Sequence, residues 1–256
     1  MPLHHVEAVM GTAISIEIVD HDDQALVDRL VQWFHHVDAE FSPYRDDSAI
    51  TMIGTGRLAP TDPAVSHEVR AVLQRCGELC EESDGAFDVW SLPSPNGTRF
   101  DPCGYVKGWS VERAADMLRA DGAQHFCINA GGDVAVGGRQ ADGSAWRIGV
   151  RHPLLPDALA FVVAVHGRAG VATSGTYERG AHIIDPRTGT AAAGGVLSAT
   201  VVGPDLAEAD AFATTLVVMG IDGLEWVERH PGYSGCVITR DAQVSSTPTF
   251  DRHLTS

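Results

Sequence analysis

Two short segments of the chain combine residue types that could bind a phosphate group and a divalent metal. In the first, D-P-C-G-Y-V-K-G-W, an acid (Asp101) and a lysine (Lys107) flank a glycine within seven residues, at an expected loop-to-helix junction. Glycine lets a ligand approach the backbone, and a helix N-terminus attracts negative charge. Lys107 is the only lysine beside 17 arginines, which indicates a site that selects a compact ammonium over a planar guanidinium. The segment does not match a P-loop, and a solvated lysine at a helix end is the simpler alternative.

The second segment, A-D-A-F-A-T, places Asp210 and Thr214 four residues apart, so that on a helix their oxygens share one face. The neighbouring alanines let another backbone come close. A carboxylate and a hydroxyl are hard oxygen ligands of the kind that Mg²⁺ accepts, while water and substrate oxygens supply the rest. The alternative is a surface aspartate beside a threonine that bonds back to its own helix.

A third region supplies a possible base. The segment T-S-G-T-Y, which contains Ser174, precedes H-I-I-D-P-R-T-G, whose end is a turn initiated by proline. His182 stands directly before two apolar residues that would pack inside, so it could project into a cleft as a proton acceptor. A core histidine with satisfied hydrogen bonds is the alternative. A serine hydrolase is disfavoured, because no G-x-S-x-G sequence surrounds Ser174.

Weaker signals come from the segment D-G-A-F-D at residues 84–88 and from Tyr44 in the loop S-P-Y-R. An aromatic side chain on a loop can stack on a flat ligand, although an isolated one more often packs against the protein. The glycines of A-G-G-D at residues 130–133 do not form the G-x-G-x-x-G fingerprint of a dinucleotide-binding fold.

Taken together, these segments resemble the ApbE family, the FAD:protein FMN transferases. Seven blocks of that family occur here in one order, from about Val9 to Met219: M-G-T before a strand, S-P-Y-R-x-x-S, G-A-F-D, D-x-x-G-x-x-K-G, I-N-A-G-G-D, S-G-x-Y with H-I-I-D-P-x-T-G, and A-D-A-x-A-T. The resemblance implies an α+β fold with mixed or antiparallel sheets, packed helices, and an FAD and metal site in a cleft.

The resemblance also implies a reaction. Family members use a divalent metal, normally Mg²⁺, to split the pyrophosphate of FAD, and they attach the FMN half through a phosphoester to a Thr or Ser of a target flavoprotein, with release of AMP. Mn²⁺ is the other metal that hard oxygen ligands would accept. The residues that match the family's FAD-contacting positions are Met10, Tyr44, Ala86, Phe87, Asp88, Asp101 and Lys107, with Ile183 or Ile184 lining the flavin pocket.

For the metal, the resemblance implies a backbone carbonyl from Gly104 and side-chain ligands from Asp210 and Thr214, and it makes His182 the general base. Pro102, Cys103 and Tyr105 depart from the residues usual in the family, which affects the local pocket shape. Two rival functions remain open. Water could replace the acceptor hydroxyl, which would give an FAD pyrophosphatase, or the chain could bind and carry flavin without catalysis.

The composition of the chain indicates which partners and which cellular compartment to expect. The 34 acidic and 18 basic residues of this 256-residue chain give a formal charge of −16, which argues against nucleic acid as a partner. No apolar run approaches the ~18 residues of a membrane span, and residues 1–10 lack the pattern of a secretory signal. Five cysteines without a C-x-x-C pair favour a reducing compartment. We therefore expect a cytoplasmic protein without membrane insertion.

The periodicity of apolar residues predicts the helices and strands that position these residues. Because strands and helices mix without regular alternation, we expect a single α+β domain over residues 1–256, or two closely packed lobes within it. The predicted strands cover residues 12–19, several segments within 126–165, then 171–175, 196–202 and 236–239. The predicted helices cover residues 22–40, 62–82, part of 104–120, 205–219 and 224–229. Residues 92–98 are predicted to be a turn, and residues 252–256 to be disordered.

Overall fold

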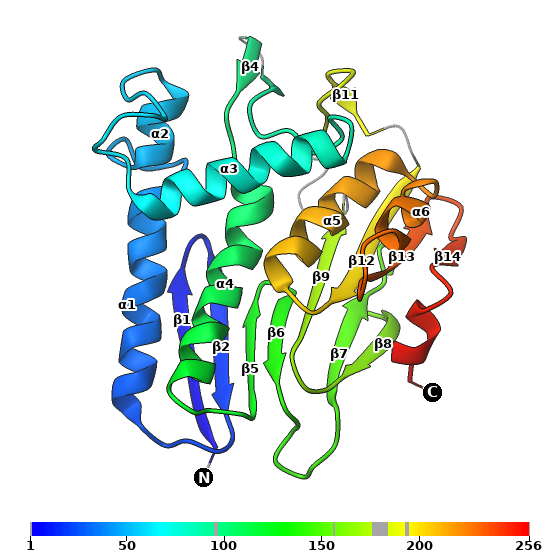
Figure 1. Cartoon of the computed structure of the whole chain (residues 1–256). Coiled ribbons are helices and arrows are strands. Elements are labelled where there is room, and N and C mark those ends of the chain that lie inside the picture. The colour runs from blue at the N-terminus through cyan, green and yellow to red at the C-terminus, as the bar shows by residue number, and fades with distance from the viewer. Residues whose placement is uncertain (1, 95–96, 156, 176–183, 193–194, 256) are drawn as a thin grey trace.

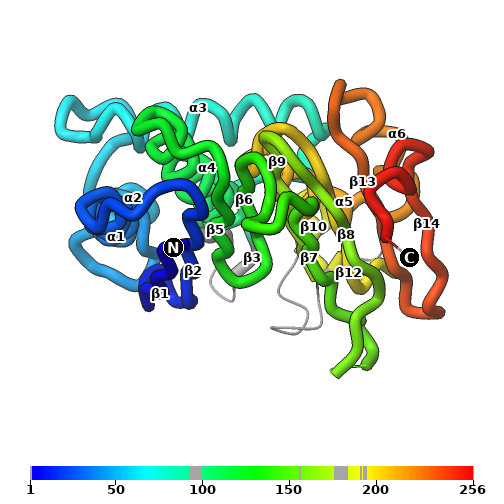
Figure 2. The backbone as a smooth tube through the Cα atoms, turned by 90° about the horizontal axis from the view of Figure 1, so that it is seen from below, coloured from blue at the N-terminus to red at the C-terminus, as the bar shows by residue number. Residues whose placement is uncertain are grey.

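One eight-stranded sheet divides the molecule into two layers. The computed structural model describes residues 2–94, 97–155, 157–175, 184–192 and 195–255. The strand order of the sheet is β1-β2-β5-β6-β9-β12-β13-β14, and every described pairing between its strands is antiparallel. The long helices cover one face, while the hairpin of β7 and β8 lies on the other, so that α3 and this hairpin are on opposite sides of the molecule (Figures 1 and 2). The α+β prediction is confirmed.

The described elements have the following bounds. The helices are α1 (Gln24–Phe41), α2 (Ala49–Gly54), α3 (His67–Glu82), α4 (Cys103–Ala120), α5 (Leu206–Met219), α6 (Gly223–Glu228) and a 3₁₀ turn, η1 (Phe250–His253). The strands are β1 (Leu3–Val9), β2 (Thr12–Ile18), β3 (Leu92–Ser94), β4 (Gly97–Arg99), β5 (Phe126–Ala130), β6 (Asp133–Gly137), β7 (Trp146–Arg151), β8 (Leu159–Val165), β9 (Ala169–Gly175), β10 (Ile184–Asp185), β11 (Thr190–Ala191), β12 (Val196–Gly203), β13 (Ser234–Thr239) and β14 (Val244–Ser246).

Two hydrophobic cores hold the layers on the sheet. The larger core joins the helices to strands such as β2, whose Ile14, Ile16 and Ile18 alternate inward with the period of a strand. The smaller core lies on the opposite face, where Trp146 and Phe250 pack against strand residues that point away from the helices. The central strands are therefore buried on both faces, which explains why β6 and β13 are buried along their whole length.

Helix α5 is unusual because it is buried almost all round. Its buried residues occupy most positions from Leu206 to Val218, since it packs against both the sheet and α4. Asp205 is the N-cap, with its side chain accepting bonds from the backbone N–H groups of Ala207 and Glu208. The carboxylate of Glu208 accepts bonds from Arg75 of α3 at 2.6 and 2.8 Å.

One end of the sheet, the upper end in Figure 1, gathers the turns and strand ends that matter for the site. The β1–β2 turn joins Val9 to Thr12, and the β5–β6 turn joins Ala130 to Asp133. Because Ile14 pairs with Ala130, these two turns lie at the same end. The register of β6 on β9 brings the end of β9 there as well. No helix in the described part of the chain is both long and apolar enough to cross a membrane.

Several predicted boundaries are wrong for identifiable reasons. The predicted helix start at Asp62-Pro63 is instead a turn in which Asp62 accepts from Ala64 N, and α3 begins after Ser66, whose hydroxyl accepts from Val69 N. The predicted turn at residues 92–98 is the β3–β4 hairpin, which stands outside the main sheet and so tolerates Pro93. Strand β1 and helix α2 were not predicted. The C-terminus is not disordered through residue 255, because Leu254 bridges to Val163.

A buried carboxylate joins α4 to the elements on either side of it. Glu112 of α4 is almost fully buried and accepts bonds from Arg119 at 2.8 Å and from Arg168 at 2.9 Å. Its other oxygen accepts from the backbone N–H of Leu206, at the start of α5, at 2.9 Å. One side chain therefore fixes α4 relative to α5 and to the start of β9.

We predict that Glu112→Gln lowers the free energy of unfolding by about 1–3 kcal/mol. The substitution removes the charged acceptor to which two arginines and one buried backbone N–H donate. Urea unfolding followed by circular dichroism measures the change. The matched control is Glu225→Gln, which breaks an exposed ion pair with Arg229 of 3.6 Å and should cost less than about 0.5 kcal/mol. Equal losses in the two variants would contradict a structural role for the Glu112 network.

Candidate functional site

The candidate site is built on a close crossing of α4 and α5. A Cβ atom at Gly108 would lie 2.6 Å from the carbonyl oxygen of Leu206 and 2.7 Å from the Cβ of Asp210, so only glycine fits there. The backbone N–H of Gly108 donates to Oδ2 of Asp210 at 2.9 Å. In a regular helix this N–H is the partner of the Gly104 carbonyl. The Asp210 carboxylate therefore competes with the Gly104 carbonyl for the N–H of Gly108.

The same crossing brings the three predicted metal ligands together. A Cβ at Gly104 would lie 3.7 Å from the hydroxyl oxygen of Thr214, one helical turn beyond Asp210. Oγ1 of Thr214 is also 3.1 Å from Oγ of Ser174, at the end of β9. Phe87 approaches from the other side, with Cε2 at 3.6 Å from the same Cβ position of Gly104. The G-A-F-D segment thus borders the start of α4.

Three charged groups surround this crossing. The side chain of Asp210 is 2% exposed and that of Asp133, the first residue of β6, is 1% exposed. Nζ of Lys107 lies 2.5 Å from Oδ2 of Asp133. The pKa of Asp210 is raised to about 7, chiefly by burial and then by the negative charge of Asp133, while the charge of Lys107 and the hydrogen bond from Gly108 N–H act in the opposite direction. The ammonium of Lys107 is thus paired with Asp133, and its charge also acts on Asp210.

The segment that follows the predicted base packs on the G-A-F-D segment. Arg187 holds Asp185 through Nε and Nη2, each at 2.9 Å, and this pair lowers the pKa of the Asp185 carboxyl. A Cβ at Gly85 would lie 3.5 Å from Cγ of Arg187. The turn initiated by Pro186 is confirmed, because Thr188 N and Gly189 N both donate to the Asp185 carbonyl. Two blocks that are about a hundred residues apart in sequence are neighbours here.

The other predicted FAD-contacting residues lie in turns and connections outside the helices and strands. Asp101 accepts from the N–H of Cys103, the first residue of α4, at 3.0 Å, and Asp88 accepts from Trp90 N at 2.7 Å. Met10 occupies the β1–β2 turn with φ of 56°, a conformation that costs energy in a residue with a side chain. Ala86 is buried beside Phe87. The side chain of Tyr44 is 91% exposed, so its ring is not used for packing.

Two predicted residues, His182 and Ile183, lie outside the described residues. Two alternatives raised by the sequence are wrong. Asp210 is not a surface residue, and the hydroxyl that bonds back to its own helix belongs to Thr215, which donates to the Ala211 carbonyl at 2.8 Å. The hydroxyl of Thr214 is directed instead to Ser174.

Sequence reasoning assigned no role to three features that the structure brings to this region. Asp133 was only the last letter of the I-N-A-G-G-D block, and Ser174 was considered only as a hydrolase nucleophile. The ring of Trp90, which follows Asp88 closely, stacks on Phe100 with centroids 4.3 Å apart. The sequence signal that could find one of them is an acid directly after a Gly-Gly pair, which is Asp133.

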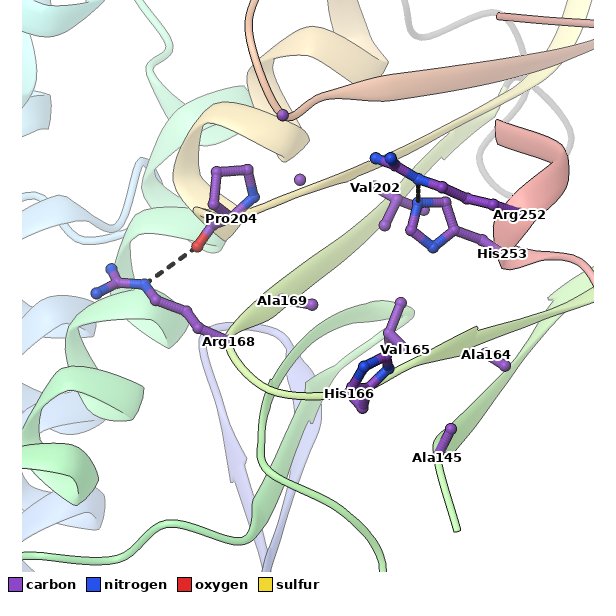
Figure 3. Close-up of a pocket in the computed structure, with 12 residues that line it drawn as sticks. Ala145, Ala164, Val165, His166, Arg168, Ala169, Val202, Pro204, Arg252 and His253 are labelled. Atoms are coloured by element: carbon purple, nitrogen blue, oxygen red, sulfur yellow. Dashed lines mark hydrogen bonds between the residues drawn. The ribbon is translucent and has the colours of Figure 1, made fainter. Parts of the chain in front are cut away.

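Two cavities in the described part of the chain lie away from this cluster. One, of about 520 Å³, is at the opposite end of β9 and is shown in Figure 3. Its basic side chains do not converge, because Arg168 turns away to donate to the Pro204 carbonyl and Arg252 donates to His253. The other, of about 400 Å³, lies between Ser83, Arg187 and Trp226. Neither is lined by a predicted site residue.

The donor set at the α4–α5 crossing suits a hard cation. A carboxylate and a hydroxyl lie on one face of α5, with the Gly104 backbone beside them, and oxygen ligands of this kind are preferred by Mg²⁺ and Mn²⁺. Among the residues described, no group of three or more His, Cys, Asp or Glu side chains could hold a metal ion. A cation at this crossing would therefore need further oxygens from a bound phosphate or water.

Comparison with known proteins identifies relatives along most of the chain. The model of the ApbE family matches residues 10–94 and 90–238. An FAD:protein FMN transferase of Vibrio cholerae is 26% identical over 85% of this chain and 81% of the relative. The one from Salmonella typhimurium is 28% identical over 96% of this chain and 88% of the relative. The FAD:protein FMN transferase of Escherichia coli (strain K12) is 30% identical over 59% of this chain and 46% of the relative.

Solved structures agree on the fold. The flavin transferase ApbE from Vibrio cholerae superposes with a TM-score of 0.87 and 24% identity over 99% of both chains. The ApbE protein from Thermotoga maritima superposes with a TM-score of 0.84 and 22% identity over the full length of both chains.

The close crossing yields a stability prediction. We expect Gly108→Ala to lower the free energy of unfolding by about 1–3 kcal/mol, because the added methyl group meets the backbone of α5. Gly77→Ala in α3 is the matched control, because a Cβ there has no neighbour within 4 Å. This substitution should raise the free energy of unfolding by about 0.5–1 kcal/mol, since alanine loses less backbone entropy than glycine in a helix. Chemical denaturation of both variants measures the difference, and a stabilised Gly108→Ala would show that α4 and α5 are not in close contact.

Proposed function

The chain belongs to the ApbE family, and from that membership we propose that it is an FAD:protein FMN transferase. The observation that carries the proposal is the cluster at the α4–α5 crossing, where Asp210, Thr214 and Gly104 lie together beside Lys107. Its relatives of 26% and 28% identity along most of the chain are named for this activity.

The proposed metal site consists of Asp210, Thr214 and the Gly104 carbonyl. These residues offer hard oxygen atoms and leave positions open for phosphate oxygens and water, as a Mg²⁺ site requires. A bound Mg²⁺ would polarise the phosphorus and stabilise the negative charge that develops on the leaving phosphate. Lys107 offsets part of the pyrophosphate charge, which a protein of formal charge −16 would otherwise repel.

The proposed reaction is phosphoryl transfer. The hydroxyl oxygen of an acceptor Thr or Ser attacks the phosphorus of the FMN half of FAD and forms a phosphoester. The bond between that phosphorus and the bridging oxygen breaks, and AMP leaves with the bridging oxygen. His182 takes the proton of the acceptor hydroxyl, a transfer that requires hydrogen-bond distance only when FAD and the acceptor are both bound.

The remaining family positions fit the binding of FAD. Phe87 and Ala86 would border the pyrophosphate end, since Phe87 touches Gly104. The exposed ring of Tyr44 is free of packing contacts that would stop it from closing over a flat ring. Met10, Asp88, Asp101 and Ile183 complete the set of proposed FAD contacts.

The function is tested with purified protein, FAD, Mg²⁺ and an acceptor protein that carries a D-G-A-T-S/T-like sequence. A denaturing gel is read for flavin fluorescence, and the solution is analysed for AMP and free FMN. A fluorescent acceptor band with release of AMP is expected. AMP with free FMN and a dark acceptor would identify an FAD pyrophosphatase, and tightly bound but intact FAD would identify a carrier.

We predict that metal removal and Asp210→Asn each abolish the fluorescent band, because a neutral amide lacks the negative charge with which the carboxylate would hold a divalent cation. EDTA should act reversibly, with the band restored by excess Mg²⁺. Asp28→Asn, on the exposed side of α1, is the matched control and should transfer FMN at the wild-type rate. A band that persists in EDTA would remove the metal from the proposed mechanism.

We predict that His182→Ala lowers the transfer rate by about 10²–10⁴-fold, which is the usual contribution of a general base, while the affinity for FAD is retained. Single-turnover transfer and flavin fluorescence titration measure the two quantities separately. His166→Ala, at the cavity of Figure 3, serves as the control. Loss of FAD binding in His182→Ala would make His182 a binding residue instead of a base.

A further inference from the structure

Asp133 is a buried acid to which the proposed mechanism gives no task. It follows the β5–β6 turn, whose glycines, Gly131 and Gly132, have φ of 62° and 105°. The turn is anchored because Gly132 N donates to the side chain of Asn129 at 2.9 Å. A Cβ at Gly131 would lie 2.8 Å from Oγ1 of Thr12, so the turn is pressed against the β1–β2 hairpin. The I-N-A-G-G-D block therefore fixes the position at which Asp133 enters the sheet.

The carboxylate of Asp133 has a defined orientation. Oδ2 lies 2.5 Å from Nζ of Lys107, and Oδ1 accepts from the backbone N–H of Thr173 at 3.3 Å. Thr173 precedes Ser174, the residue whose hydroxyl meets that of Thr214. Asp133 is thus held by β9 on one side and holds the α4 lysine on the other.

The Lys107 ammonium has a second possible partner. Lys107 is the residue next to Gly108, whose N–H binds Asp210, and the charges of Lys107 and Asp133 both act on the Asp210 carboxyl. If Lys107 moved onto Asp210, it would neutralise the carboxylate that the proposed metal site needs. An ammonium and a divalent cation would then compete for one ligand.

We propose that Asp133 is a positioning residue that holds the Lys107 ammonium away from Asp210, so that Asp210 remains available to the metal and Lys107 remains directed at the pyrophosphate. This inference rests on the proposed function, because it assumes a divalent cation at the α4–α5 crossing. The ion pair of 2.5 Å and the near-complete burial of Asp133 support it, since a buried carboxylate keeps its charge only with a close partner.

The test measures metal binding rather than turnover. Mn²⁺ is titrated into protein with FAD and without an acceptor, and free Mn²⁺ is read by electron paramagnetic resonance. Asp133→Asn keeps the shape of the side chain but removes its charge. We expect it to weaken Mn²⁺ binding by about 10–100-fold, as changes to groups that orient metal ligands do.

A second pair of variants separates positioning from a general effect of charge. In the Lys107→Met background no ammonium can reach Asp210, so Asp133→Asn should cost much less Mn²⁺ affinity than it does in the presence of Lys107. Equal losses in the two backgrounds would overturn the positioning role, because Asp133 would then act through its charge alone. Unchanged Mn²⁺ affinity in Asp133→Asn would overturn the inference altogether.

Glu112→Gln is the matched control for loss of a buried, ion-paired carboxylate on the same face of the sheet. It should lower stability and leave Mn²⁺ affinity unchanged; an equal loss of Mn²⁺ affinity would make the Asp133 effect a consequence of general destabilisation. If the wild-type protein binds no Mn²⁺, the proposed metal site fails together with this inference. If it binds Mn²⁺ and FAD but transfers no FMN, the transferase proposal fails while the role of Asp133 is still decided by the variants.

Discussion

The contact between Gly108 and Asp210 is the constraint on which the rest of the site depends. Because position 108 has no side chain, α4 and α5 approach until the backbone N–H of Gly108 reaches the Asp210 carboxylate at 2.9 Å. That approach sets Gly104 beside Thr214 and leaves Lys107 next to the crossing. The Glu112 network, which binds the first N–H of α5, fixes the same two helices one turn further along. A cation site made of a backbone carbonyl and two short side chains requires this degree of proximity.

Charge is the second constraint, because under the proposed function an acidic protein would have to accept a pyrophosphate at this site. Two carboxylates that are nearly inaccessible to water, Asp133 and Asp210, stand around the single lysine of the chain. Burial and the charge of Asp133 raise the pKa of Asp210 to about 7, so the ionised carboxylate is costly to keep at this place. A divalent cation at this point would relieve that cost, so the arrangement favours metal binding.

The sheet supplies the geometry that unites distant segments. Antiparallel pairing brings the β1–β2 turn, the β5–β6 turn and the end of β9 to one end, and α4 and α5 place their site residues over it. The opposite face carries a second core under the β7–β8 hairpin, which buries the central strands on both faces. The cavity of Figure 3 lies at the other end of β9 and takes no part in this arrangement.

The sequence by itself determined the family, the α+β class and the amphipathic helices, and it supplied most residues of the candidate site, whose roles stay predictions. Ordered blocks and short spacings, such as that of Asp210 and Thr214, are local properties that a linear pattern preserves. It did not determine where α3 begins, because Asp62-Pro63 and Ser66 are both acceptable caps and only packing selects between them. It also did not show that Asp133 faces Lys107 or that Ser174 meets Thr214. Those contacts join segments separated by 26 and 40 residues, and their partners are chosen by sheet register and by the α4–α5 crossing, which only the tertiary structure decides.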